Sequence, residues 1–170
     1  MITALILPDV LRTNHRTFTL RRVAESDLGA LISLLADDPI SAVRGDRAEE
    51  LDTAAYRSAL KELMSDSSNE VLLVVNDAGE PVATMQLTRI PGLSRRGATR
   101  LLVEAVRVRS IERSSGIGSA VMRWVTTTAA AATGASLVQL TSDQEREDAH
   151  RFYERLGFVG SHRGFKFQVD

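Results

Sequence analysis

The sequence predicts a mixed α/β domain, in which helices flank a central sheet that is mostly antiparallel and contains one parallel strand pair. Three observations support this fold class. Short alternating or β-branched runs predict strands, and periodic apolar runs between them predict helices. Strand, helix and strand also follow one another across residues 100–140, and such a unit requires a parallel pair with a right-handed crossover.

The first half of the chain gives these elements in order. FTLRRV (18–23) alternates apolar and polar residues and predicts a strand, after which Ser26 or Asp27 can cap a helix. Residues 47–64 have a looser apolar face and predict a second helix. The run at 71–75 and the run at 81–90 are joined by the turn residues NDAG, so we expect them to form a hairpin.

The second half begins with a loop, PGLSRRGAT (91–99), and a long strand at 100–109. A helix opens at RSSGIG and continues to about Thr133, and SLVQL (136–140) is the next strand. A short helix at 145–156 ends at Gly157, which suits the position after a helix C-terminus. We expect residues 158–169 to supply the last strand or strand pair.

Length and composition limit the function. A chain of 170 residues has the size of one domain, and we expect an N-terminal extension at 1–16 followed by a single domain at 17–170. The net charge of −1 gives no indication of a nucleic-acid partner. The absence of cysteine excludes disulfides, thiolate metal ligands and a cysteine nucleophile, and the three dispersed histidines predict no metal site. No signal peptide or membrane span is predicted, which agrees with a cytoplasmic protein.

The glycines of RSSGIG lie between a predicted strand and a predicted helix. The first N–H groups of a helix have no partner within the helix and carry the positive end of its dipole, and glycine lets an oxygen-rich group approach closely. The segment therefore predicts a phosphate cradle, although an ordinary turn explains a G-x-G at a helix start about as well. It lacks the third glycine of the dinucleotide fingerprint and the G-K-[ST] of the nucleotide P-loop.

A second cluster favours the cradle. AHRFYERLGF (149–158) follows the next predicted parallel strand. With these two motifs the sequence resembles the GNAT superfamily of acetyl-CoA-dependent N-acetyltransferases. The family's Q/R-x-x-G-x-G/A loop matches Arg113 to Gly118, and its later motif matches Ala149, Phe152-Tyr153 and Gly157-Phe158. The order of the predicted elements is also that of the family.

The resemblance implies how acetyl-CoA would bind. In the family, the strand before the loop splays from its parallel neighbour and pairs with the pantetheine arm through its backbone. The residues implied for this backbone role are Ala105, Val106, Arg107 and Val108. The residues implied for the pyrophosphate are Arg113, Ser114, Ser115, Gly116, Ile117, Gly118 and Ser119. Many members have an Asn contact to the cofactor where this chain has Asp143 or Arg146, and an ionised Asp cannot donate a hydrogen bond there.

Glu104 interrupts the apolar run LLVEAVRV, where a buried charge is out of place. One explanation is a charge at a sheet edge or an ion pair with one of the many arginines. The other is a general base, because family members often carry a glutamate at this point. An alkylamine with a pKa of about 10.4 is neutral in only about one molecule in 10³ at pH 7, so its acetylation requires a base.

Tyr153 is either an aromatic core residue or, as the resemblance implies, the acid near the coenzyme sulfur that protonates the leaving thiolate. A thiol with a pKa of about 8.5 is a good leaving group, so we expect a modest contribution from Tyr153. His150 is expected on the helix surface or beside the cofactor rather than as a catalytic base.

The resulting prediction is an N-acetyltransferase that acts by direct attack of a primary amine on acetyl-CoA, with a small molecule favoured over a protein as acceptor. The alternatives are a non-catalytic acyl-CoA-binding or regulatory domain on the same scaffold and a nucleotide-binding protein. We expect the acceptor site in the first two helices and the 91–99 loop, where Arg95 and Arg96 fit either an acidic acceptor or a solvated loop. The resemblance also implies a homodimer, with GFKFQV (164–169) as an edge strand at the interface.

Overall fold

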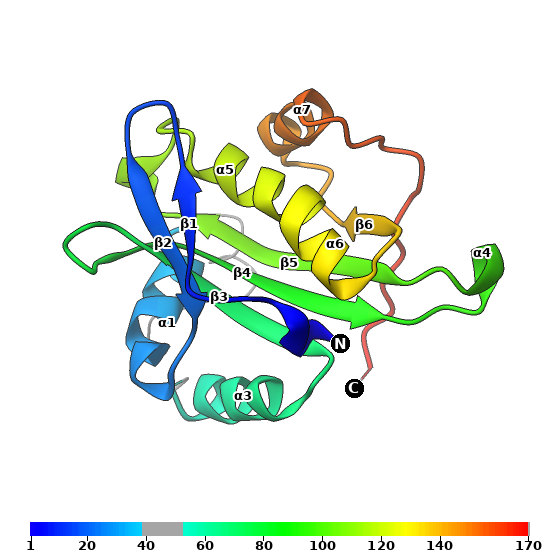
Figure 1. The fold of residues 1–170 in the computed structure, drawn as a ribbon, viewed down its shortest axis with the longest axis horizontal. Coiled ribbons are helices and arrows are strands. Elements are labelled where there is room, and N and C mark those ends of the chain that lie inside the picture. The colour runs from blue at the N-terminus through cyan, green and yellow to red at the C-terminus, as the bar shows by residue number, and fades with distance from the viewer. Residues whose placement is uncertain (39–52, 170) are drawn as a thin grey trace.

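The computed structural model describes residues 1–38 and 53–169, which form a six-stranded sheet with helices on both faces (Figure 1). The strands are β1 (Asp9–Arg12), β2 (Thr17–Arg22), β3 (Asn69–Val75), β4 (Pro81–Ile90), β5 (Arg100–Val108) and β6 (Leu137–Leu140). The α-helices are α1 (Leu28–Ala36), α3 (Thr53–Ser65), α4 (Ser94–Gly97), α5 (Ile117–Trp124), α6 (Ala130–Thr133) and α7 (Glu147–Arg155). A π-helical segment, η5 (Val125–Ala129), joins α5 to α6, and 3-10 turns lie at η1 (Ile2–Ala4), η2 (Glu25–Asp27) and η4 (Ser110–Glu112).

The strands lie in the sheet in the same order as in the chain. The four pairs from β1 to β5 are antiparallel, and β5 pairs with β6 in parallel. The predicted hairpin of residues 71–75 and 81–90 is confirmed as β3 and β4, and the predicted parallel pair is confirmed as β5 and β6. The mixed α/β fold class is therefore confirmed.

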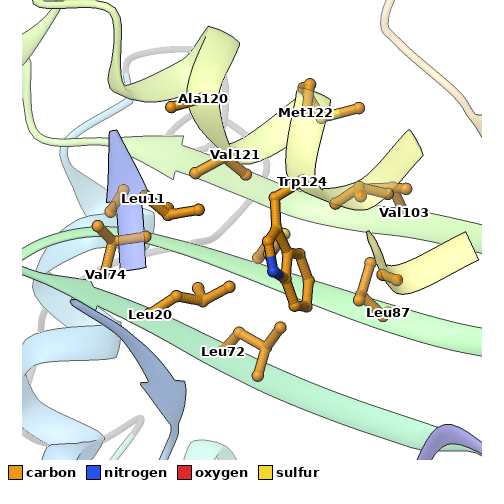
Figure 2. Close-up of a cluster of buried hydrophobic side chains, with 14 of the residues drawn as sticks. Leu11, Leu20, Leu72, Val74, Leu87, Val103, Ala120, Val121, Met122 and Trp124 are labelled. Carbon is orange, nitrogen blue, oxygen red and sulfur yellow. The ribbon is translucent and has the colours of Figure 1, made fainter. Parts of the chain in front are cut away.

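The larger core lies between the sheet and the continuous helical run from α5 to α6. Figure 2 shows Trp124 of this run beside Leu72 of β3 and the other buried side chains. The indole Nε1 of Trp124 donates a hydrogen bond of 2.7 Å to the carboxylate of Asp9. The apolar face of α5 thereby packs on the sheet and is also tied to β1.

A smaller core lies on the opposite face, where α1 and α3 cover the sheet (Figure 1). Leu31 and Ile32 of α1 pack with Leu60 of α3 against Leu73 and Val75 of β3. The predicted second helix over 47–64 is described only from Thr53 onward, and its earlier part lies outside the described residues. Among the described residues, no helix is long and apolar enough to span a bilayer.

The N-terminal residues pack on the larger core. Ile2, Leu5 and Leu11 are buried in it, and β1 pairs along its whole length with β2. The sequence left the structure of residues 1–16 open. The apolar run at the start of the chain buries its side chains against the domain, and the turn at 13–16 returns the chain into β2.

The expectation of a last strand or strand pair at 158–169 is wrong. No strand is present between Phe158 and Val169, and Val159, Phe165, Phe167 and Val169 are 82% to 91% exposed. Alternating apolar residues form a strand when a neighbouring edge and an apolar surface are available to them. In this chain the segment pairs with no strand, and its apolar side chains remain exposed.

Candidate functional site

A bulge in β5 shapes the site. Thr84 of β4 pairs with Arg107 and Gln86 pairs with Glu104, so one residue of β4 lies opposite two residues of β5. Ala105, inside the bulge, has a φ of +50°, which is unusual for a residue with a side chain. A bulge bends its strand and changes the direction of the side chains that follow. Glu104 and Arg107 consequently point to the same face of the sheet, although three positions separate them.

Just before the bulge, β5 separates from β6. Their parallel pairing covers four positions and ends at Val103 and Leu140, whereas β5 continues to Val108. Residues 104–108 thus have β4 on one side and, within the described part of the chain, no strand on the other. The backbone role predicted for Ala105, Val106, Arg107 and Val108 requires such a free edge, because an extended chain can pair with it as an added strand.

The predicted pyrophosphate loop lies directly after this edge. Ser114 has a φ of +65° and Gly116 a φ of +88°, and α5 begins at Ile117. The turn is fixed by Ser115, whose hydroxyl and N–H both donate to the carbonyl of Glu112. Because α5 begins at Ile117, the N–H groups of Gly118 and Ser119 belong to its first turn and have no carbonyl partner within the helix. The loop can therefore receive an anion.

The two glycines leave room for other parts of the protein. A Cβ at Gly118 would lie 3.3 Å from the ring of Phe152 on α7 and 3.9 Å from Val108 of β5. A Cβ at Gly116 would lie 3.5 Å from the side chain of Thr13, in the turn between β1 and β2. The absence of side chains at the two glycines thus allows α7 and the N-terminal hairpin to pack against the loop.

Tyr153 follows Phe152 on α7 and lies in an aromatic cluster. Its ring contacts those of Phe152 and Phe158 edge to face, with centroids 5.1 and 5.8 Å away. Burial raises the pKa of the Tyr153 phenol, and the charges of Arg107 and Arg146 lower it by a smaller amount. The phenol is therefore neutral at pH 7 and retains a proton that it can donate.

Asp38, after the end of α1, joins both sides of the opening between β5 and β6. Its carboxylate accepts hydrogen bonds from both terminal nitrogens of Arg146, directly before α7. The Nε atom of Arg107 on β5 lies 3.9 Å from the same carboxylate. Asp38 is buried, so the three charges form a partly desolvated cluster beside Tyr153.

Glu104 is exposed, which corrects the expectation of a buried carboxylate. It lies opposite Gln86, which lies opposite Val71, and Val71 packs against the core under α1 and α3. Directly opposite residues point to the same face of a sheet, so Glu104 points to the face that carries α1 and α3. Within the described part of the chain its carboxylate has no hydrogen bond or ion pair, which leaves it accessible to water and to an acceptor.

The remaining predicted residues have structural contacts. The guanidinium of Arg113 donates to the carbonyls of Asp37 at 2.8 Å and Val108 at 3.4 Å, which ties the loop to the end of α1. Asp143 lies in the turn before α7, where its carboxylate accepts the N–H of Glu145. Nε2 of His150 lies 2.7 Å from the carbonyl of Asp143. No group of three His, Cys, Asp or Glu side chains among residues 1–38 and 53–169 could hold a metal ion.

Sequence reasoning missed Asp38 and Thr13. Both are distant in sequence from the residues that they contact, and neither belongs to a recognisable motif. Asp38 directly follows another aspartate in LLADDP, and nothing in this segment indicated that its charge would be buried.

A search with family models matches residues 31–158 to the acetyltransferase (GNAT) family. The chain belongs to the GNAT acetyltransferase family. The match contains the glycine loop, the bulged strand β5 and α7, which are the main elements of the site. It begins after the N-terminal hairpin.

Solved structures agree with this assignment. A crystal structure described as a transcriptional regulator from Bacillus halodurans C-125 has 39% identity and a TM-score of 0.83, covering 89% of this GNAT chain and 99% of its own. A candidate acetyltransferase from Agrobacterium tumefaciens str. C58 has 27% identity and a TM-score of 0.73, with coverages of 88% and 99%. Glucosamine-6-phosphate N-acetyltransferase from Arabidopsis thaliana has 18% identity and a TM-score of 0.70, with coverages of 90% and 99%, and shares the fold. The comparison with curated proteins gave no match.

Proposed function

We propose that this GNAT protein is a cytoplasmic N-acetyltransferase that transfers the acetyl group of acetyl-CoA to a primary amine of a small molecule. The observation that carries the proposal is the free edge of β5. Its residues 104–108 lead from an accessible carboxylate, Glu104, to a glycine loop that can receive a pyrophosphate. Tyr153 contacts the ring that packs on this loop.

In the proposed reaction the amine nitrogen attacks the thioester carbonyl carbon, a C–N bond forms and the C–S bond breaks. Glu104 takes the proton that the amine loses, through a water molecule, since its carboxylate is exposed. The Tyr153 phenol, whose pKa is raised by burial, gives a proton to the departing thiolate. The chain has no cysteine, so a cysteinyl acyl-enzyme cannot form, and the proposed attack on acetyl-CoA is direct.

A second candidate is a non-catalytic acyl-CoA-binding or regulatory protein. It is favoured by the description of the 39% identical neighbour as a transcriptional regulator. The presence of both Glu104 and Tyr153 favours the enzyme.

The test separates the two candidates. Purified protein is titrated with acetyl-CoA by calorimetry and then incubated with acetyl-CoA and a panel of small amines, with mass analysis of the products. Acetylated amine and equimolar free CoA are expected. Binding of acetyl-CoA without product from any amine favours the regulatory candidate, and absence of binding refutes both.

A further inference from the structure

The hairpin of β1 and β2 lies outside the matched residues 31–158 but touches the glycine loop. Its turn is closed by hydrogen bonds in both directions. The Thr13 N–H donates to the carbonyl of Arg16 at 2.9 Å, and the Arg16 N–H donates to Oγ1 of Thr13 at 3.1 Å. The turn is therefore a defined support and places the side chains of Thr13 and Arg16 at fixed positions.

Two contacts connect this turn to the loop. Nη1 of Arg16 forms an ion pair of 2.9 Å with Oε2 of Glu112, and the Thr13 side chain occupies the space beside Gly116. Glu112 is also the residue whose carbonyl accepts both hydrogen bonds from Ser115. Arg16 thus holds the residue on which the loop turns.

The loop requires such support because two of its residues have left-handed backbone. Ser114 and Gly116 have φ values of +65° and +88°. A side-chain-bearing residue in this region is strained by about 1 kcal/mol or more and keeps the conformation only when its surroundings fix it. Side chains of the hairpin and of α7 lie nearest to the two glycines of the loop, and Val108 of β5 lies slightly farther from Gly118.

We propose that the N-terminal hairpin is a positioning element of the acyl-donor site, in which Arg16 and Thr13 hold residues 113–119 in the conformation that receives the pyrophosphate of acetyl-CoA. This inference rests on the proposed function. It adds to the donor site a segment of the chain outside the matched residues, and it makes Arg16 a positioning residue without a contact to the ligand.

The experiment reverses the charge of Arg16 and measures acetyl-CoA affinity by calorimetry. Arg16→Glu replaces an attraction by a repulsion at Glu112, so affinity should fall about 5- to 10-fold, the range expected for the loss and reversal of one accessible ion pair. The double variant Arg16→Glu/Glu112→Arg restores the attraction with the charges exchanged. Its affinity should return to within about 3-fold of the original value.

The matched control is the ion pair of Arg22 and Glu70 at the other end of β2. Its N–O distance is 2.7 Å, and its side chains are 40% and 15% exposed, against 46% and 17% for Arg16 and Glu112. Arg22 also donates to the carbonyl of Leu5, and Arg16 also lies over the ring of Phe18, so each charge reversal removes one further contact besides the ion pair. Arg22→Glu should leave the affinity for acetyl-CoA unchanged.

A second measurement follows the local stability of the loop in the absence of ligand. Amide hydrogen exchange of residues 113–119 should be faster in Arg16→Glu than in the unaltered protein and Arg22→Glu. If the unaltered protein binds acetyl-CoA and Arg16→Glu binds it equally well, or if Arg22→Glu weakens binding as much, the inference is wrong and the proposed function stands. If the unaltered protein does not bind acetyl-CoA, the proposed function fails and the inference fails with it.

Discussion

At the residue scale, the test of the proposed chemistry is Glu104→Gln. The amide keeps the shape of the side chain but cannot accept the amine proton, so turnover at pH 7 should fall by about 10²-fold or more while acetyl-CoA still binds. The defect should shrink as the pH rises, because a larger share of the amine is then neutral on arrival. The measurement is turnover against pH with one good acceptor. Normal turnover at pH 7 would make Glu104 a surface residue without a catalytic role.

Tyr153→Phe is the comparison variant, because it removes a proton donor to the thiolate and leaves the amine side intact. Its loss should be smaller, since the thiolate is a good leaving group. Burial keeps the pKa of Tyr153 above its ordinary value, so the phenol stays protonated across neutral pH and the defect should not shrink between pH 7 and pH 9. A defect that disappears with rising pH, as for Glu104→Gln, would contradict the assigned role.

Asp27 gives a prediction for stability. Its carboxylate forms two hydrogen bonds with Arg21, at 2.7 and 2.8 Å, and accepts the N–H of Ala24. The bonds with Arg21, more than that with Ala24, lower the pKa of Asp27 in the folded state, so their stabilisation is present above the unfolded value of about 3.9 and is lost as the pH falls through the folded value.

Asp27→Asn should therefore lower the free energy of unfolding by about 1–2 kcal/mol at pH 7, the usual contribution of hydrogen bonds to a charged group. Below about pH 4 the difference from the unaltered protein should narrow. Urea unfolding at pH 7 and at pH 3 measures both values, with Asp77→Asn in the β3–β4 turn as the control. A difference that is constant with pH would exclude the ionised carboxylate as its cause.

The residues of the site differ in how far the sequence predicts them. The loop and the Phe152-Tyr153 pair are contiguous motifs, so their positions can be read from the chain, and the structure brings both to one place at Gly118. Asp38 and Thr13 reach the site only through tertiary packing. Glu104 was located on the correct strand, but the sequence predicted burial because the run around it is apolar. The register between β5 and β4 decides on which face of the sheet Glu104 lies.

At the scale of elements, the conformation of the glycine loop should determine the affinity for acetyl-CoA. Gly116→Ala adds a Cβ to a residue with a φ of +88°, which destabilises the backbone by about 1 kcal/mol and brings a methyl group against Thr13. The loop should relax away from its left-handed conformation, and acetyl-CoA affinity should fall about 10-fold. Calorimetry on the folded variant measures this.

The matched control is Gly134→Ala, after α6. Gly134 has a φ of +66°, and a Cβ there would meet no atom within 4 Å, so the backbone effect is similar and the site is untouched. Both variants should lose similar stability in urea, and only Gly116→Ala should lose affinity. Equal affinity for acetyl-CoA in the two variants would show that the loop conformation does not affect donor binding.

Most elements could be predicted because each has a local pattern. The hairpin of β3 and β4 is marked by its turn residues, and the helix before Gly157 by the glycine that follows it. The bulge of β5 has no such mark, since Ala105 carries a Cβ and lies in an ordinary apolar run. Its conformation depends on the register with β4. The strand predicted for residues 158–169 is absent for a related reason. Alternation specifies which face of a strand would be apolar, but it does not specify a neighbouring strand with which to pair.

At the scale of the whole molecule, the C-terminal segment has exposed apolar side chains that a second copy of the chain could cover. Phe165, Phe167 and Val169 alternate with Lys166 and Gln168, and the three apolar side chains are 84% to 91% exposed. In the part of the chain that the structure describes, β6 pairs with β5 and with no other strand. Within the described part of one chain, the segment has a strand-like pattern of exposed apolar residues, and the outer edge of β6 has no partner strand. We propose that a second copy covers both, with two-fold symmetry that makes the two contacts equivalent.

The prediction is a mass of twice 18.6 kDa by light scattering at micromolar concentration. Phe165→Asp/Phe167→Asp places two charges in the proposed interface and should give a monomer, since burying them unpaired at an interface is unfavourable. Leu93→Asp/Ile111→Asp changes two exposed apolar residues elsewhere, 97% and 81% exposed, and should remain a dimer. Acetyl-CoA affinity should be unchanged in the monomer, because the glycine loop, β5 and α7 all come from one chain. A monomeric mass for the unaltered protein would contradict the proposed homodimer. A dimer that persists in Phe165→Asp/Phe167→Asp would place the interface on another surface.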